Sequence, residues 1–143
     1  MTFIDKLLIL AAAAQVALTL GILVWLSLER VPRVARGEIA VEDIATAGDA
    51  YPLRARLLSN SFDNQFQLPV LFYVLTILAI ITRHADVLFV VMAWIFVLSR
   101  LAHAYVHVTS NRVNIRGPVF GIGLLVLMLM WLIFIVRILA GLP

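Results

Sequence analysis

The 143-residue sequence contains no cysteine and only three histidines. Without cysteine the chain can form no disulfide and supplies neither a thiolate nucleophile nor a soft metal ligand, so any sulfur chemistry must come from a bound ligand. Three histidines are too few for the histidine-rich iron sites of membrane oxygenases. The sequence also has no glycine-rich phosphate-binding loop, which argues against nucleotide-dependent chemistry of that kind.

Charge is scarce as well. Charged residues make up 13% of the chain and hydrophobic residues 64%, with a mean hydropathy of +1.07. A soluble domain carries roughly 45–50% apolar residues, so the excess must face something other than water. Four mostly uncharged runs approach the roughly 20 residues that a membrane-crossing helix needs. We therefore expect an all-α integral membrane four-helix bundle, a single domain over residues 1–143, with spans at about 7–28, 66–82, 87–108 and 119–138.

The positive charges outside these spans are distributed unevenly. The first apolar run is longer than the roughly 7–15 residues of a signal-peptide core, so we expect it to remain as a membrane span. By the positive-inside rule, the arginine-rich loops lie in the cytoplasm and both termini lie on the opposite side. This topology accounts for the net charge of +3 without a nucleic-acid partner. The expected cytoplasmic side holds Arg30, Arg33, Arg36, Arg54, Arg56, Arg112 and Arg116, and the other side holds Lys6, Arg83 and Arg137.

Prolines indicate where two of the helices begin. Asp49 and Pro52 are typical of a helix start and predict a second helix from about Pro52 to Thr82. At 1.5 Å per residue this helix would be roughly 45 Å long, so its first turns would stand outside the bilayer. Pro118 is predicted to open the fourth helix.

Two stripes of polar residues interrupt the apolar pattern. On the third helix, His103, His107 and Asn111 share one face, and five polar residues share one face of the second helix. In the expected topology both stripes lie at the same depth, with Arg112 and Arg116 just beyond. Polar groups inside a membrane mark either a functional site or a hydrogen-bond network within the bundle, and both interpretations stay open. The second-helix stripe consists of Arg56, Asn60, Asp63, Asn64 and Gln67.

Arg100 lies deeper in the third span than the histidines. A lone cation there costs about 2.5–3.5 kcal/mol on insertion scales, so Arg100 must have a partner. We expect that partner to be Asp63, Gln67 or a backbone carbonyl, and we expect Arg100 to be mainly structural.

The polar residues allow more than one kind of site. His103 and His107, at i and i+4, could bind one metal ion together with Asp63, but this spacing is a weak signal and no metal is expected. Ser99 has no base positioned to activate it as a nucleophile. Positive charge and amide donors instead suit a small anionic ligand that enters from the cytoplasm and meets an apolar partner from the bilayer.

Two motifs resemble the MAPEG family, the membrane-associated proteins in eicosanoid and glutathione metabolism, in the form of a prokaryotic-type member. NQFQLPVLFY, residues 64–73, is similar to the family's Asn-x-x-Glu followed by a proline and an apolar run. RLAHAYVH, followed later by NIRGPVF, is similar to its Arg-x-x-His segment with an arginine opening the fourth helix. Together with the four spans, the resemblance covers essentially the whole chain. It implies a homotrimer with glutathione bound between neighbouring subunits near the cytoplasmic face.

The resemblance also implies roles for individual residues. Asn64, Arg100, His103 and Arg116 stand where the family's polar site residues stand, and Arg116 would be the catalytic residue that stabilises a thiolate. With the two stripes, the glutathione-binding set becomes Arg56, Asn60, Asn64, Gln67, His103, His107 and Arg112.

Several positions depart from the family pattern. Gln67 replaces the family's glutamate, and His107 stands where a tyrosine is common. Gly117 and Phe120 stand where catalytic members have a serine and a tyrosine. The resemblance thus implies a glutathione-dependent transferase or peroxidase acting on lipophilic substrates. The departures favour the alternative, a non-catalytic lipid-binding, scaffold or accessory subunit, with membrane lipids or a larger membrane complex as partners.

Overall fold

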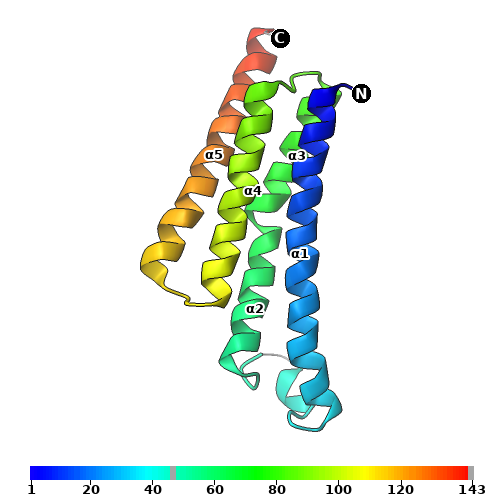
Figure 1. Cartoon of the computed structure of the whole chain (residues 1–143), viewed down its shortest axis with the longest axis vertical. Helices are drawn as coiled ribbons and strands as arrows, with labels where there is room; N and C mark the ends of the chain where they lie inside the picture. The colour runs from blue at the N-terminus through cyan, green and yellow to red at the C-terminus, as the bar shows by residue number, and fades with distance from the viewer. Residues whose placement is uncertain (46–47, 142–143) are drawn as a thin grey trace.

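The computed structural model describes residues 1–45 and 48–141, and this part of the chain contains helices and no strand. Four helical segments are long and apolar enough to cross a membrane, one at each predicted span. The predicted all-α, four-span architecture is confirmed, and the chain is a multi-pass membrane protein. The elements, shown in Figure 1, are α1 (Phe3–Ala35), η1 (Glu42–Ile44), α2 (Leu53–Asp63), η2 (Asn64–Phe66), α3 (Leu68–Ile81), α4 (Val87–Val108) and α5 (Val113–Ala140).

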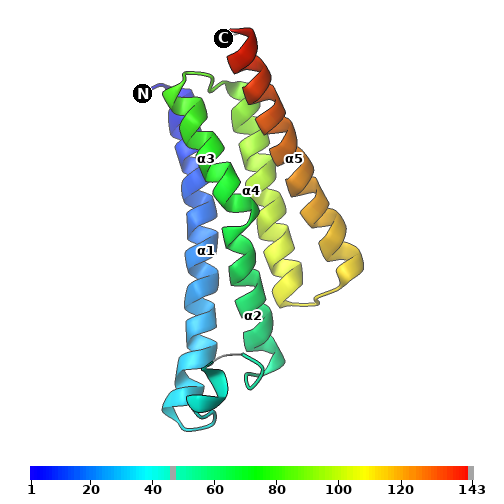
Figure 2. The same cartoon turned by 180° about the vertical axis from the view of Figure 1, so that it is seen from behind.

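The spans run alternately up and down, so α1 begins at the same end of the bundle where α5 finishes (Figure 1). α2 and α3 follow one another beside α1, α4 packs against both α1 and α2, and α5 packs along α4. Seen from either side, α5 leans away from α4 toward the α4–α5 connection (Figure 2). The α1–α2 end of the bundle extends beyond that connection.

The second span is not the continuous helix predicted over residues 52–82. The 3₁₀ turn η2 and Gln67, at φ −97° and ψ −102°, separate α2 from α3. Pro69 lies in the first turn of α3, has no backbone N–H, and its ring clashes with the carbonyl four residues earlier. A regular helix therefore cannot pass this point without losing a hydrogen bond, and the break lies one turn before the proline.

α5 begins at Val113, five residues before Pro118, so the predicted start of the fourth helix was wrong. The first four N–H groups of a helix have no partner within it, and a proline in the second turn removes only one further bond. The carbonyl that lacks a helix hydrogen bond because of Pro118 is that of Asn114, an exposed residue. As a result, Arg116 lies within the first four residues of α5.

The two halves of the bundle have different interiors. Toward the start of α1, a large apolar core includes Phe72 and Phe96, whose stacked rings lie 4.7 Å apart. Toward the α4–α5 connection, only a small apolar cluster around Leu58 is present, and buried polar residues occupy the space beside it. Large apolar side chains such as Leu125 and Leu132 point outward, as surfaces that face lipid require.

α4 and α5 approach closely at Gly123. A Cβ atom at this position would lie 2.5 Å from Ser99 Oγ, whose hydroxyl donates to the Phe96 carbonyl at 2.6 Å. Gly121, two residues away, has open space where its Cβ would be. The small residue at 123 is therefore needed for this helix contact, as in other membrane bundles.

We expect Gly123→Ala to lower stability by about 1–3 kcal/mol, because the new methyl group would displace Ser99 or separate the helices. Adding Ser99→Ala should restore much of the loss, since the Ser99 Cβ would remain 3.6 Å away. Thermal unfolding in detergent would measure both effects. Gly121→Ala is the matched control and should be neutral or slightly stabilising. Equal stability of the two single variants would contradict the predicted contact.

A second anchor joins the start of α4 to the end of α5. Asp86 caps α4 by accepting the Phe89 N–H at 2.9 Å, and its other oxygen accepts from Arg137 Nη2 at 2.7 Å. Partial burial raises the pKa of the Asp86 carboxyl, but the bonds from Phe89 and Arg137 outweigh burial and leave the pKa lowered.

A lowered folded-state pKa means that Asp86 stabilises the fold fully above the unfolded carboxyl pKa of about 3.9, and progressively less as pH falls through the folded value. Asp86→Ala should therefore cost about 1 kcal/mol at neutral pH, and the difference from wild type should shrink below about pH 4. Unfolding measured across pH would test this. Asp43→Ala, which removes an exposed carboxylate without an ion pair to any described residue, should show no such dependence.

Candidate functional site

The largest fully buried side chain among the described residues is that of Arg100. Its side chain is fully buried, and Nη2 donates to the Nδ1 of His103, one turn further along α4, at 2.8 Å. The guanidinium also lies over the ring of Phe120 on α5, 5.0 Å from the ring centroid. Nε and Nη1 are buried and have no hydrogen-bond partner in the described chain. Of the three guanidinium nitrogens of Arg100, only Nη2 thus forms a hydrogen bond within the described chain.

The predicted partners of Arg100 were wrong. Asp63 and Gln67 are exposed, and the hydrogen bond of Arg100 goes to His103 instead. The reason is local, because residues three apart on a helix are neighbours. Gln67 lies at the break between α2 and α3, where the regular helix face assumed by the prediction ends.

The two predicted polar stripes meet at Asn64 and His107. The Asn64 Nδ2 lies 3.4 Å from the His107 Nδ1, and His107 packs edge-on against His103 with ring centroids 5.6 Å apart. Both histidines are almost completely buried. The structure therefore brings together one residue of the second-span stripe and two of the third.

The α4–α5 connection adds a further cation to this cluster. Arg116 donates to the Asn111 Oδ1 at 2.5 Å, and its positive charge acts on both His103 and His107. Asn111 adopts a left-handed conformation with φ +48°, which asparagine tolerates better than most residues. Arg112 is exposed at the N-cap of α5. We call the group formed by Asn64, Arg100, His103, His107, Asn111 and Arg116 the histidine cluster.

Three predicted site residues lie elsewhere in the protomer. Arg56 pairs with Asp49 at 3.2 Å and, with the exposed Asn60, lines a small polar pocket of about 180 Å³ near the start of α2. Gln67 is exposed at the helix break. Asn60 and Arg56 nevertheless stand on α2, one and two turns before Asn64, which caps the end of that helix.

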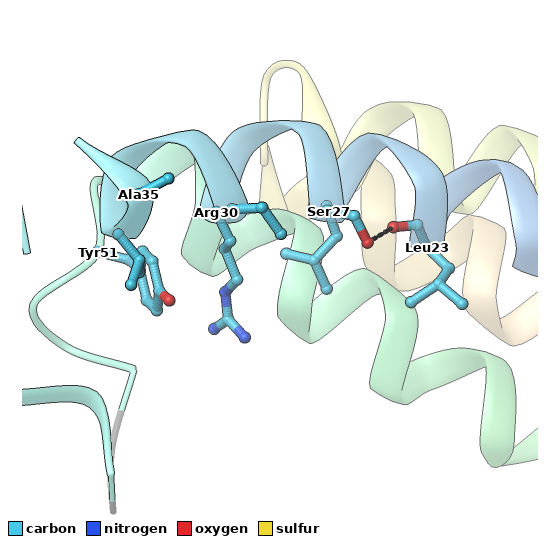
Figure 3. A pocket seen from close by; sticks show the side chains of 8 residues that line it. Leu23, Ser27, Arg30, Ala35 and Tyr51 are labelled. Carbon is cyan, nitrogen blue, oxygen red and sulfur yellow. Dashed lines mark hydrogen bonds between the residues drawn. The ribbon is translucent and has the colours of Figure 1, made fainter. Parts of the chain in front are cut away.

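Sequence reasoning missed a groove at the end of α1. The groove measures about 560 Å³, and Arg30 and Tyr51 lie side by side in it, with the guanidinium 4.3 Å from the ring centroid (Figure 3). Apolar residues of α1 such as Leu23 line the rest. In the sequence, Arg30 serves only to predict the membrane topology. Tyr51, next to the predicted helix start, is the only available signal of the groove.

Sequence reasoning also missed a buried amide pair. Gln15 donates to the Gln65 Oε1 at 2.9 Å, and Gln65 donates to the Ser61 carbonyl at 3.0 Å. This pair ties α1 to the 3₁₀ turn that ends in Phe66 and carries Asn64. The lone glutamine in the first apolar run could have signalled it, since amides inside a membrane seek partners.

The histidine cluster and the neighbouring Arg112 carry positive charge. Arg100, Arg112 and Arg116 form no ion pair with a carboxylate in the described part of the chain. Among the described residues, no three histidines or carboxylates gather as a metal site would require. Unpaired guanidinium groups and amide donors at one depth are suited to bind an anion.

A model of the MAPEG family matches residues 8–136 of the chain. No curated protein and no solved structure matches it significantly.

The Gln15–Gln65 pair leads to a prediction. Gln15→Leu should lower stability by about 1–3 kcal/mol, because the buried Gln65 Oε1 would lose its donor. The double variant with Gln65→Leu should be more stable than Gln15→Leu alone, because it leaves no orphaned amide at this position. Chemical or thermal unfolding in detergent would measure the series. Gln67→Leu, which changes an exposed glutamine two residues away, is the control, and a loss as large as that of Gln15→Leu would argue against the pair.

Proposed function

The chain belongs to the MAPEG family, and from this membership and the histidine cluster we propose a membrane-embedded glutathione-dependent transferase or peroxidase that acts on lipophilic substrates. The single observation that carries the proposal is the carboxylate-free arrangement of Arg100 and Arg116 around two buried histidines. Such a cluster is poorly compensated in a bilayer unless an anion joins it.

Glutathione fits the donors that are present. At neutral pH it carries two carboxylates, an ammonium group and a thiol, so it can accept several charge-assisted hydrogen bonds. Arg112 is the candidate for one of its carboxylates, and Asn64, His103 and His107 supply further polar contacts. Arg100, whose Nη2 bonds to His103, would contribute positive potential to the site without a contact to the ligand.

A homotrimer would complete the site. Arg56, Asn60 and Gln67 are exposed in the protomer and take no part in the described polar contacts of the histidine cluster. In a trimer, these residues of one subunit would lie against the cluster of its neighbour, which gives every predicted glutathione-binding residue a place in one site. With the arginine-rich loops in the cytoplasm, glutathione would enter from water and the lipophilic substrate from the bilayer.

When bound, glutathione supplies a thiol that can add to an electrophile or reduce a hydroperoxide. The chain would contribute the charge of Arg116 near that sulfur. A nearby guanidinium favours the thiolate form, the nucleophile, over the thiol.

A second candidate function is non-catalytic lipid binding, in a scaffold or accessory subunit of a larger membrane complex. The groove at the end of α1 favours this function, because Arg30 lies in it beside apolar residues, and such a combination suits an anionic lipid. Gln67, Gly117 and Phe120, which depart from the family pattern, favour it too.

Glutathione binding separates the two candidates. The purified protein should bind glutathione in calorimetry, release protons at neutral pH and show thiolate absorbance in the ultraviolet. Arg116→Ala should abolish the thiolate signal and weaken binding about 10- to 100-fold, the loss of one charged contact. Lys6→Ala, which removes a cation at the other end of the bundle, is the control and should change neither.

Absence of binding at millimolar glutathione would remove the enzyme proposal. Anionic lipid that copurifies with the protein and is lost in Arg30→Ala would then support the lipid-binding role.

A further inference from the structure

We propose that Arg100 is a positioning residue that holds His103 as the neutral Nε2–H tautomer, so that His103 presents an N–H donor to the anionic sulfur or carboxylate of the bound ligand. The ligand part of this inference rests on the proposed function. The tautomer part concerns the protein alone.

The direction of the Arg100–His103 hydrogen bond decides the tautomer. Arginine has five N–H donors and no acceptor, so the bond of 2.8 Å must run from its Nη2 to the Nδ1 of His103. A ring nitrogen that accepts a hydrogen bond carries no proton. The imidazole is then neutral, and its one proton is on Nε2.

The bond has little freedom to rearrange. Arg100 is fully buried, and Phe120 covers its guanidinium on the side of α5. The close approach of α5 at Gly123 adds to this confinement, since a Cβ there would lie 3.8 Å from the Arg100 Cδ. Because the two residues are one helical turn apart, the backbone of α4 sets their separation.

The other ring nitrogen of His103 is available. No hydrogen bond joins its Nε2 to another residue of the described chain. The hydrogen bond from Arg100 goes to the other ring nitrogen, Nδ1. The charged or titratable neighbours are His107 on α4 and Arg116 on α5, neither of which is an acid. A donor with cations around it and no internal acceptor is suited to an anionic acceptor from outside.

The proposed donor compensates for two departures from the family pattern. Gly117 and Phe120 remove the two hydroxyl groups expected beside Arg116. An Nε2–H on His103 would take the place of a hydroxyl as the neutral hydrogen-bond donor of the site. The free Nε and Nη1 of Arg100 would then reinforce the field that favours an anion without touching it.

Nitrogen-15 NMR of histidine-labelled protein in detergent or nanodiscs tests the tautomer without any ligand. The His103 signals, assigned by their loss in His103→Gln, should show an unprotonated Nδ1 and a protonated Nε2. Arg100→Leu should convert them to a mixture of tautomers, and Arg100→Lys, which keeps a donor, should restore the wild-type pattern. A protonated Nδ1 in the wild type would overturn the inference, even if the Arg100 variants fail to fold.

Titration with glutathione and with S-methylglutathione tests the donor. A shift of the His103 Nε2–H signal with glutathione alone would identify the sulfur as acceptor, and a shift with both would identify a carboxylate. His84, at the other end of the bundle, serves as the internal control and should not move. If calorimetry shows binding and the His103 signal stays still, the donor role is wrong. If neither compound binds, the proposed function fails, while the ligand-free spectra still decide the tautomer.

Discussion

The constraint on which the rest of this structure depends is a cation inside a membrane-spanning helix. Arg100 is fully buried in α4, where an unpaired guanidinium is expensive, and no described carboxylate forms an ion pair with it. It is accommodated by a histidine one turn away, by the face of Phe120 and by an α5 that approaches closely at Gly123. His103, which packs against His107, and Phe120 on α5 both contact that one side chain.

The same half of the bundle gives up apolar packing to hold polar groups. Its apolar cluster is small, and Gln15, Gln65 and the two histidines are buried beside it. The break before Pro69 belongs to this arrangement, because the 3₁₀ turn carries Asn64 to His107 and Gln65 to Gln15. Stability therefore comes mainly from the aromatic half near the start of α1, which leaves the other half able to serve a ligand.

A site made of arginines, amides and imidazoles has an electrostatic preference before any substrate is known. It favours an anion over a cation and a hydrogen-bond acceptor over a donor. Membership of the MAPEG family makes glutathione the natural candidate. In the proposed site, histidine takes the donor role that the two absent hydroxyl groups would have had. Whether the bound molecule reacts depends on how closely its sulfur approaches Arg116.

The sequence alone determined the membrane-spanning all-α architecture, because runs of about 20 apolar residues have no other stable environment. It also determined the family, and helical periodicity with topology predicted that the two polar stripes lie at one depth. That Asn64 meets His107 within them was decided by the tertiary structure. The break in the second span, the earlier start of α5, the Gln15–Gln65 pair and the true partner of Arg100 were decided by the tertiary structure. The Gln15–Gln65 pair and the choice of His103 rather than Asp63 or Gln67 depend on a competition among polar groups that is decided only once the helices pack. Periodicity along one helix carries no information about that competition.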